Sequence, residues 1–230
     1  MVQHKNTVFG IGTGRCGTES LATLFNQQKK SRVTHERYRW RLAWEHSESQ
    51  VDSILNKEPE KSERAFDLYG DVAYSWLPYI DLIMRFNPEA KVICLKRDKD
   101  ATVNSWLKTP YNHWQKHDGT EYRFGHWSRC FPKFDSCFSR KQAIEFYWEL
   151  YYAKAAEYQE RYPNNFKIFS IEALNNLDDQ TRLLKFAGIP PKRQVHEIGI
   201  KKNEHIAKKD ADSESGIEPE VVELSDAIAS

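Results

Sequence analysis

The sequence predicts a three-layer α/β fold, with a mostly parallel central sheet and helices on both faces. Short β-prone runs alternate with segments of helical apolar spacing along the 230 residues. The first run, residues 7–11, ends in a glycine cluster, and residues 91–95 form the clearest strand. Such alternation favours a parallel sheet, whose crossover helices pack on its faces. Right-handed crossovers then place the loops after the strands along one edge, where ligands bind.

The expected elements alternate from the start of the chain. Strands are expected, in chain order, over residues 7–11, 32–35, 66–73, 91–95 and 166–171. Helices are expected over residues 18–28, 41–56, 76–86, 99–108, 140–161 and 175–187. In the first helix Leu21, Leu24 and Phe25 recur at helical spacing. Asp98 is the expected N-cap of the fourth helix, and Gly188 closes the last.

We expect a single domain over residues 1–230, with two segments of distinct character. Residues 109–139 are dense in aromatic side chains but lack a sustained period, which favours an insert or lid over a linker. Residues 201–230 form a charged C-terminal segment, with a short apolar helix expected at 219–227. The sequence contains no signal for an oligomeric state.

Composition restricts the function classes. The 34 Lys and Arg are balanced by 33 Asp and Glu, so the basic surplus of a nucleic-acid binder is missing and any anion site is local. No segment reaches the about 18 apolar residues of a membrane span, and the first apolar run is too short for a signal peptide. The four cysteines form no CxxC pair, which favours reduced thiols. We therefore expect a cytoplasmic protein.

The glycine cluster after the first strand is typical of an anion-binding loop. Residues 10–18 read GIGTGRCGT and lead into the first helix. Glycines let backbone N–H groups turn toward an anion, and the helix N-terminus adds partial positive charge. Arg15 adds a cation, and Thr18 a hydroxyl donor. The loop is not a Walker A motif, because Thr18 stands where Lys would follow Gly17. Taken alone, it is also compatible with a plain glycine-rich turn.

A second candidate anion site lies in residues 91–106, KVICLKRDKDATVNSW. Arg97 stands at the carboxyl end of the expected strand, and Ser105 follows eight residues later in the next helix. An arginine fork and a hydroxyl suit a second phosphate group at the same sheet edge. The alternative is an Arg97 that pairs with Asp98 or Asp100 on the surface.

Together, these motifs resemble the sulfotransferase family. Residues 15–18, RCGT, correspond to the family's loop for the 5′-phosphosulfate. Arg97, Ser105 and Trp106 correspond to its 3′-phosphate motif. Residues 169–174, FSIEAL, and 183–190, LLKFAGIP, are similar to the family's late strand and helix. The likeness therefore runs in order over roughly residues 7–209.

The resemblance implies a P-loop nucleotide-hydrolase-like fold and a sulfuryl transfer. The co-substrate would be 3′-phosphoadenosine 5′-phosphosulfate, the product adenosine 3′,5′-bisphosphate, and no metal would be required. The acceptor would be a hydroxyl or amine on a carbohydrate or small molecule. In line with the composition, no nucleic-acid partner and no membrane span are expected. The implied donor-binding residues are Gly14, Arg15, Cys16, Gly17, Thr18, Glu19, Ser20, Arg97, Ser105, Lys201 and Lys202.

The resemblance also implies roles in the reaction. Arg15 would stabilise the leaving group, although many members have Lys there and Arg cannot shuttle a proton. Glu19 stands where a Ser or Thr is common, and Ser20 can supply the missing hydroxyl. The acceptor's base would be Glu36 or His35, at the end of the second strand, with Glu36 favoured because carbohydrate-directed members often have Glu here.

The sequence also allows other interpretations of its site residues and its function. Asp71, near the end of the third strand, is a third candidate for the base and could contact the acceptor. A P-loop-type nucleotide kinase would share the fold but lacks the loop lysine and a clear magnesium carboxylate. A non-catalytic nucleotide-binding module would keep both anchors. His113 and His117 lack a third zinc ligand, and Cys16 as a nucleophile lacks an assigned partner.

Overall fold

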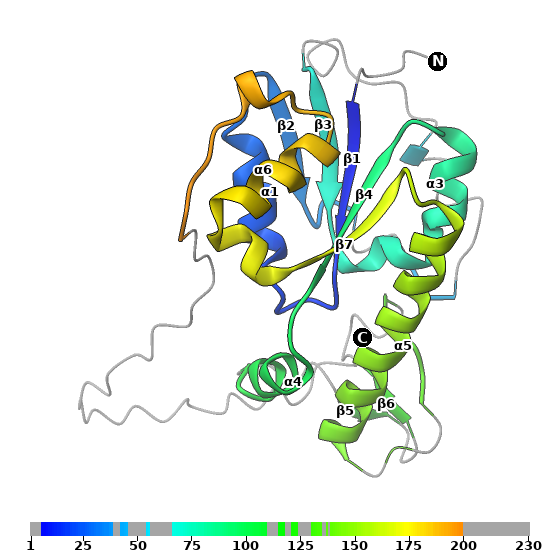
Figure 1. Cartoon of the computed structure of the whole chain (residues 1–230). Coiled ribbons are helices and arrows are strands. Elements are labelled where there is room, and N and C mark those ends of the chain that lie inside the picture. Colours follow the sequence, from blue (N-terminus) through cyan, green and yellow to red (C-terminus); the bar gives the residue numbers. More distant parts are fainter. Residues whose placement is uncertain are drawn as a thin grey trace, which may run out of the picture.

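The computed structural model contains a central five-stranded parallel sheet (Figure 1). Its strands are, in spatial order, β2 (Ser31–His35), β3 (Leu68–Val72), β1 (Asn6–Ile11), β4 (Lys91–Lys96) and β7 (Phe166–Ser170). All four neighbouring pairs run parallel, which confirms the expected sheet. The structure describes residues 6–38, 42–45, 54–55, 66–109, 115–117, 121–123, 130–134, 137 and 139–199.

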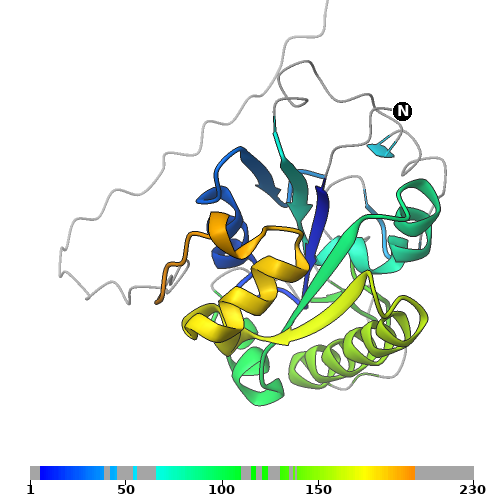
Figure 2. The same ribbon diagram turned by 45° about the horizontal axis from the view of Figure 1, so that its top comes forward.

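Helices cover both faces of the sheet, as Figures 1 and 2 show. One face carries α1 (Thr18–Asn26) and α6 (Leu177–Phe186). The other carries the 3₁₀ helix η2 (Tyr74–Tyr79), α3 (Ile80–Phe86) and the long helix α5 (Arg140–Arg161). Helix α4 (Lys99–Leu107) lies beyond the carboxyl end of β4, and two short 3₁₀ helices, η4 (Ile171–Asn175) and η5 (Pro191–Arg193), flank α6.

The two faces have different cores. Leu21, Leu24 and Phe25 of α1 are fully buried and pack toward the sheet. Their helical spacing in the sequence therefore marks the buried face of this helix. The opposite core is aromatic, and Trp76 meets Phe9 of β1 edge to face at 5.0 Å between ring centroids. Large rings fill this layer, where apolar burial and ring geometry both contribute to stability.

Several expected boundaries hold, and one expected helix does not begin as predicted. Helix α5 has the predicted bounds, and the Asp98 carboxylate caps α4 by accepting from Ala101 N at 2.8 Å. The helix expected over residues 41–56 is wrong at its start, because residues 42–45 are not helical. There the Tyr79 hydroxyl donates to the Ala43 carbonyl at 2.6 Å.

Other helix predictions were also too long, and one hairpin was missed. The segment 76–86 starts as the 3₁₀ helix η2 and becomes α-helical only at Ile80. Helix α6 starts at Leu177, capped by Asn176. In the aromatic-rich insert, β5 (Gln115–His117) pairs antiparallel with β6 (Glu121–Arg123), although the sequence there shows no sustained alternation.

Part of the insert belongs to the core. Phe131 is buried and stacks on Tyr74 at 4.9 Å between centroids, with Trp106 edge-on at 6.2 Å. The charged segment 201–230, with Lys201, Lys202 and the helix expected at 219–227, lies outside the described residues. Among the helices that the structure does describe, none has the length and apolar character to cross a bilayer.

Candidate functional site

The phosphate loop joins β1 to α1 in a conformation suited to an anion. Gly14, Arg15 and Gly17 have φ angles of 75°, 56° and 84°. A positive φ is costly for Arg15, and such strain concentrates at ligand sites. The N-cap residue of α1 makes no side-chain cap hydrogen bond, and the partial positive charge of a helix N-terminus suits an anionic ligand. Glu19 lies in that first turn, half-buried, whereas Ser20 is buried in the helix face.

The loop and the second motif fit together through Trp106. This indole is 5% exposed and lies against Gly14, where an added Cβ would come within 2.8 Å of a ring carbon. Gly14 is therefore required both by its left-handed φ and by the close approach of the ring. The tryptophan of the α4 motif thus fixes the position of the phosphate loop rather than facing solvent.

The two predicted anion sites meet. Arg97 Nη1 donates to the Arg15 carbonyl at 2.9 Å, and Arg15 Nε donates to the Ser105 hydroxyl at 3.1 Å. Their strands β1 and β4 are direct neighbours, which brings both loops to the same edge. The alternative pairing of Arg97 with an adjacent aspartate is not observed, because Asp98 caps α4 instead.

The two guanidinium groups create a local excess of positive charge. Within the described residues, neither Arg15 nor Arg97 has a carboxylate at ion-pair distance. Burial, followed by repulsion from Arg97, lowers the pKa of Arg15 below its usual value. Like charges held together in partial burial are unfavourable without a counter-ion. This part of the sheet edge therefore favours an anionic ligand.

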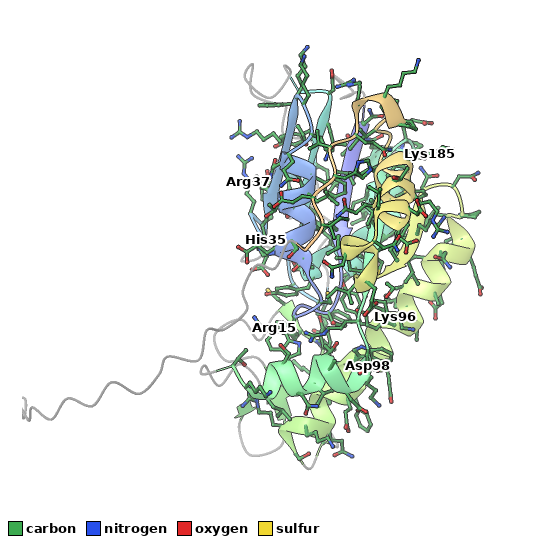
Figure 3. All side chains as sticks on the ribbon, turned by 60° about the vertical axis from the view of Figure 1, so that its left-hand side comes forward. Arg15, His35, Arg37, Lys96, Asp98 and Lys185 are labelled. Atoms are coloured by element: carbon green, nitrogen blue, oxygen red, sulfur yellow. The ribbon has the colours of Figure 1, made fainter. Side chains whose placement is uncertain are left out.

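The candidate bases stand beside the loop. His35 Nε2 lies 3.2 Å from the Thr18 hydroxyl and 4.0 Å from Glu36 Oε1. Glu36 has a φ of 53°, and its N–H donates to the Val72 carbonyl at 2.9 Å. In Figure 3, Arg15, Lys96 and Asp98 lie toward one end of the sheet and Lys185 toward the other, while His35 lies between Arg37 and Arg15.

Asp71 has a structural role instead of the expected contact with an acceptor. It is 2% exposed, and its oxygens accept from the Thr34 hydroxyl at 2.6 Å and from Trp76 Nε1 at 2.8 Å. The Arg37 N–H is a third donor, at 3.2 Å. Burial raises the pKa of Asp71, against the effect of these donors. The carboxyl group thus ties the ends of β2 and β3 together beneath the surface.

Cys16 is fully buried under the loop, which argues against a nucleophilic role. Burial raises the pKa of its thiol to about 11. The reactive species is the thiolate, whose population at neutral pH falls as the pKa rises. Cys16 fits instead as the small residue of the loop, with its sulfur in the place that a Cβ on Gly12 would occupy.

We expect Cys16 in the folded protein to resist iodoacetamide at pH 8 and to react once the chain is unfolded. Unfolding restores the ordinary thiol pKa, so the thiolate fraction at this pH rises. In the folded protein, the rate should also increase as the pH is raised toward 11. Mass spectrometry of the labelled loop peptide measures both rates. Rapid labelling of Cys16 at pH 8 without unfolding would contradict this placement.

The remaining predicted residues are only partly described. Lys201, Lys202 and His113 lie outside the described residues, and only the backbone of His117 is described. In the part of the chain that is described, no three potential metal ligands gather. Sequence reasoning missed the α5 side chains behind the loop, whose only signal was their helical spacing: Trp148, Tyr151 and Tyr152.

Comparisons with known proteins identify the family of this chain. The family model for the sulfotransferase domain matches residues 7–186. A search of curated proteins found no match. Among solved structures, a sulfotransferase from Alicyclobacillus acidocaldarius has 15% identity and a TM-score of 0.47, with 86% of each chain covered. Mouse sulfotransferase SULT7A1 complexed with PAP has 13% identity and a TM-score of 0.47, with 82% of this chain and 60% of that chain covered.

The family match begins at the first strand and extends through the last α-helix that the structure describes. It includes the phosphate loop, the end of β2 with His35 and Glu36, and the α4 motif. Because that match spans well over half of the chain, this protein belongs to the sulfotransferase family and is an enzyme of sulfuryl transfer.

Proposed function

We propose that the donor is 3′-phosphoadenosine 5′-phosphosulfate and that the acceptor is a hydroxyl or amine, on a carbohydrate or other small molecule. The closeness of Arg15 and Arg97, without a carboxylate partner in the described residues, supports this proposal most directly. A nucleotide with anionic groups at both its 3′ and 5′ positions supplies the missing negative charge. Arginine forks and backbone N–H groups suit such oxygens.

Each group has a role in an in-line displacement. The bond between sulfur and the donor's phosphate oxygen breaks while the acceptor oxygen bonds to sulfur, and the acceptor's proton passes to Glu36. Negative charge grows on the departing bisphosphate, where Arg15 and the loop N–H groups stabilise it. Because Arg15 Nε donates to the Ser105 hydroxyl, the other N–H groups of the Arg15 guanidinium remain for the ligand. His35, in contact with Thr18, is the second candidate base.

Arg97 and Ser105 bind the 3′-phosphate in this proposal, and residues 14–20 bind the 5′ end. Lys201 and Lys202 are further donor-binding candidates on the family resemblance alone, since they lie outside the described residues. A nucleotide kinase is disfavoured, because Thr18 stands at the position of the essential loop lysine. In the described part of the chain Cys16, Cys94 and Cys137 are free thiols, which supports a reducing compartment such as the cytoplasm.

Thermal shift assays test the donor. Adenosine 3′,5′-bisphosphate without metal is expected to raise the Tm, because a ligand that binds only the folded state stabilises it by mass action. ATP with magnesium should give a smaller shift. Stabilisation by ATP with magnesium alone would overturn the donor assignment.

The acceptor follows from turnover with radiolabelled donor over a panel of sugars, phenols, alcohols and amines. We expect sulfated product from at least one class. If the bisphosphate raises the Tm and every class in the panel stays unmodified, the acceptor proposal fails while the donor proposal stands.

A further inference from the structure

One face of helix α5 lies behind the two anion sites. Trp148, Tyr151 and Tyr152 are spaced three and four residues apart, so they share one side of the helix. Tyr151 is 0% exposed and Tyr152 4%. The rings pack on one another, with centroids 4.8 Å apart for Trp148 and Tyr152 and 5.5 Å apart for the two tyrosines. Figures 1 and 2 show α5 running along the sheet on the side opposite α1 and α6.

Tyr151 holds the phosphate loop from behind. Its hydroxyl oxygen accepts from the Gly12 N–H at 3.0 Å, and the hydroxyl donates to the Tyr74 carbonyl at 3.0 Å. One buried phenol therefore joins the loop after β1 to the segment after β3. Burial raises the pKa of Tyr151 well above its usual value, so the phenol keeps the proton that it donates. The Gly12 N–H and the Tyr74 carbonyl are both buried backbone groups. Leaving either of them without a hydrogen bond would cost free energy of folding.

Tyr152 and Trp148 hold the end of β4. The Tyr152 hydroxyl donates to the Leu95 carbonyl at 2.8 Å, and Trp148 Nε1 donates to the Arg97 carbonyl at 3.1 Å. Between these residues, the Lys96 ammonium lies 5.1 Å from the Trp148 ring centroid and 5.3 Å from that of Tyr152. Cation–π attraction thus adds to the two hydrogen bonds. The backbone that carries Arg97 is attached to the same helix face as the phosphate loop.

We propose that the α5 face made of Trp148, Tyr151 and Tyr152 sets the spacing between the two anion sites. These are positioning residues, because they act on the backbone of Gly12 and Arg97 rather than on the ligand. The 3′ and 5′ groups of one nucleotide lie at a limited range of separations, so a fixed distance between their sites reduces the cost of binding both. The identity of that ligand rests on the proposed function.

The test compares ligands that bear one or both phosphates. Tyr151→Phe and Trp148→Phe each remove hydrogen bonds from the face, with Tyr158→Phe as control, since Tyr158 is buried on the same helix but packs on Phe166. Calorimetry gives the Kd for adenosine 3′,5′-bisphosphate and for the 3′- and 5′-monophosphates. We expect bisphosphate binding to weaken about fivefold to tenfold in both test variants, and monophosphate binding to change less than about twofold. Equal weakening of all three ligands, or none, overturns the proposal.

A second measurement does not depend on the donor. Hydrogen exchange of the ligand-free protein, read in a peptide spanning residues 9–20, should be faster in Tyr151→Phe than in wild type and unchanged in Tyr158→Phe. If wild-type protein fails to bind the bisphosphate, the proposed function is wrong. The hydrogen-exchange result still tests whether α5 positions the phosphate loop. Unchanged exchange in a folded Tyr151→Phe variant would overturn the role of α5.

Discussion

Glu36→Gln is expected to lower kcat by a factor of about 10² to 10⁴ while leaving the Kd for adenosine 3′,5′-bisphosphate unchanged. The amide keeps the shape of the side chain and the strained φ of 53° but cannot take up the acceptor's proton. Donor binding stays intact because the cations of that site come from β1 and β4, not from β2. Steady-state turnover and calorimetry measure the two quantities separately.

Two further variants test whether Glu36 is the base. Glu89→Gln is the matched control, since Glu89 is exposed just before β4 at the opposite end of the sheet. His35→Gln should reduce turnover less than Glu36→Gln, and it should weaken donor binding slightly because the contact with Thr18 changes. If Glu36→Gln turns over normally and His35→Gln does not, the base is His35. Normal turnover by both would remove the end of β2 from the mechanism.

Arg97→Ala is expected to raise the Kd for adenosine 3′,5′-bisphosphate by about 10- to 150-fold. The magnitude follows from about 1.5–3 kcal/mol for charge-assisted hydrogen bonds and 1.4 kcal/mol per factor of ten. The substitution also removes the donor to the Arg15 carbonyl, which supports the strained loop. Arg97→Lys should give an intermediate loss, because a point charge replaces a two-pronged donor.

A control variant and the salt dependence of binding show whether the loss in Arg97→Ala is specific to this arginine. Arg182→Ala removes an arginine that is exposed on α6 and pairs with Asp179, and we expect it to leave nucleotide binding unchanged. Binding to wild type should weaken as salt rises, because the attraction between opposite charges is screened, and this dependence should be smaller in Arg97→Ala. Wild-type affinity in Arg97→Ala would exclude this residue from the donor site.

Much of the geometry of the candidate site could be predicted from sequence because its parts are local. A glycine loop after a buried strand, and an arginine at the end of another, each fall within one strand–turn–helix unit. Parallel pairing of β1 and β4 then brings Arg15 and Arg97 together. The sequence did not reveal that the two residues would touch, because this depends on the left-handed turn at Arg15.

Features that depend on distant contacts were not predictable. One such contact is the hydrogen bond from Tyr79 to Ala43, in the non-helical start of segment 41–56. The support of the loop by α5 depends on contacts such as Tyr151 to Gly12, more than a hundred positions apart in sequence. For Asp71, residue type and place at the sheet edge indicated a reactive acid, whereas its three donors and deep burial give it a structural role.

The order β2-β3-β1-β4-β7 also has an evolutionary consequence. The loops proposed to bind the donor follow β1 and β4, which are interior strands with a neighbour on each side. The residues proposed to meet the acceptor lie at the end of β2, which among the described residues pairs with β3 alone. Border strands open more readily than central ones. New acceptor preferences can therefore arise by substitution along that border while nucleotide chemistry is inherited unchanged.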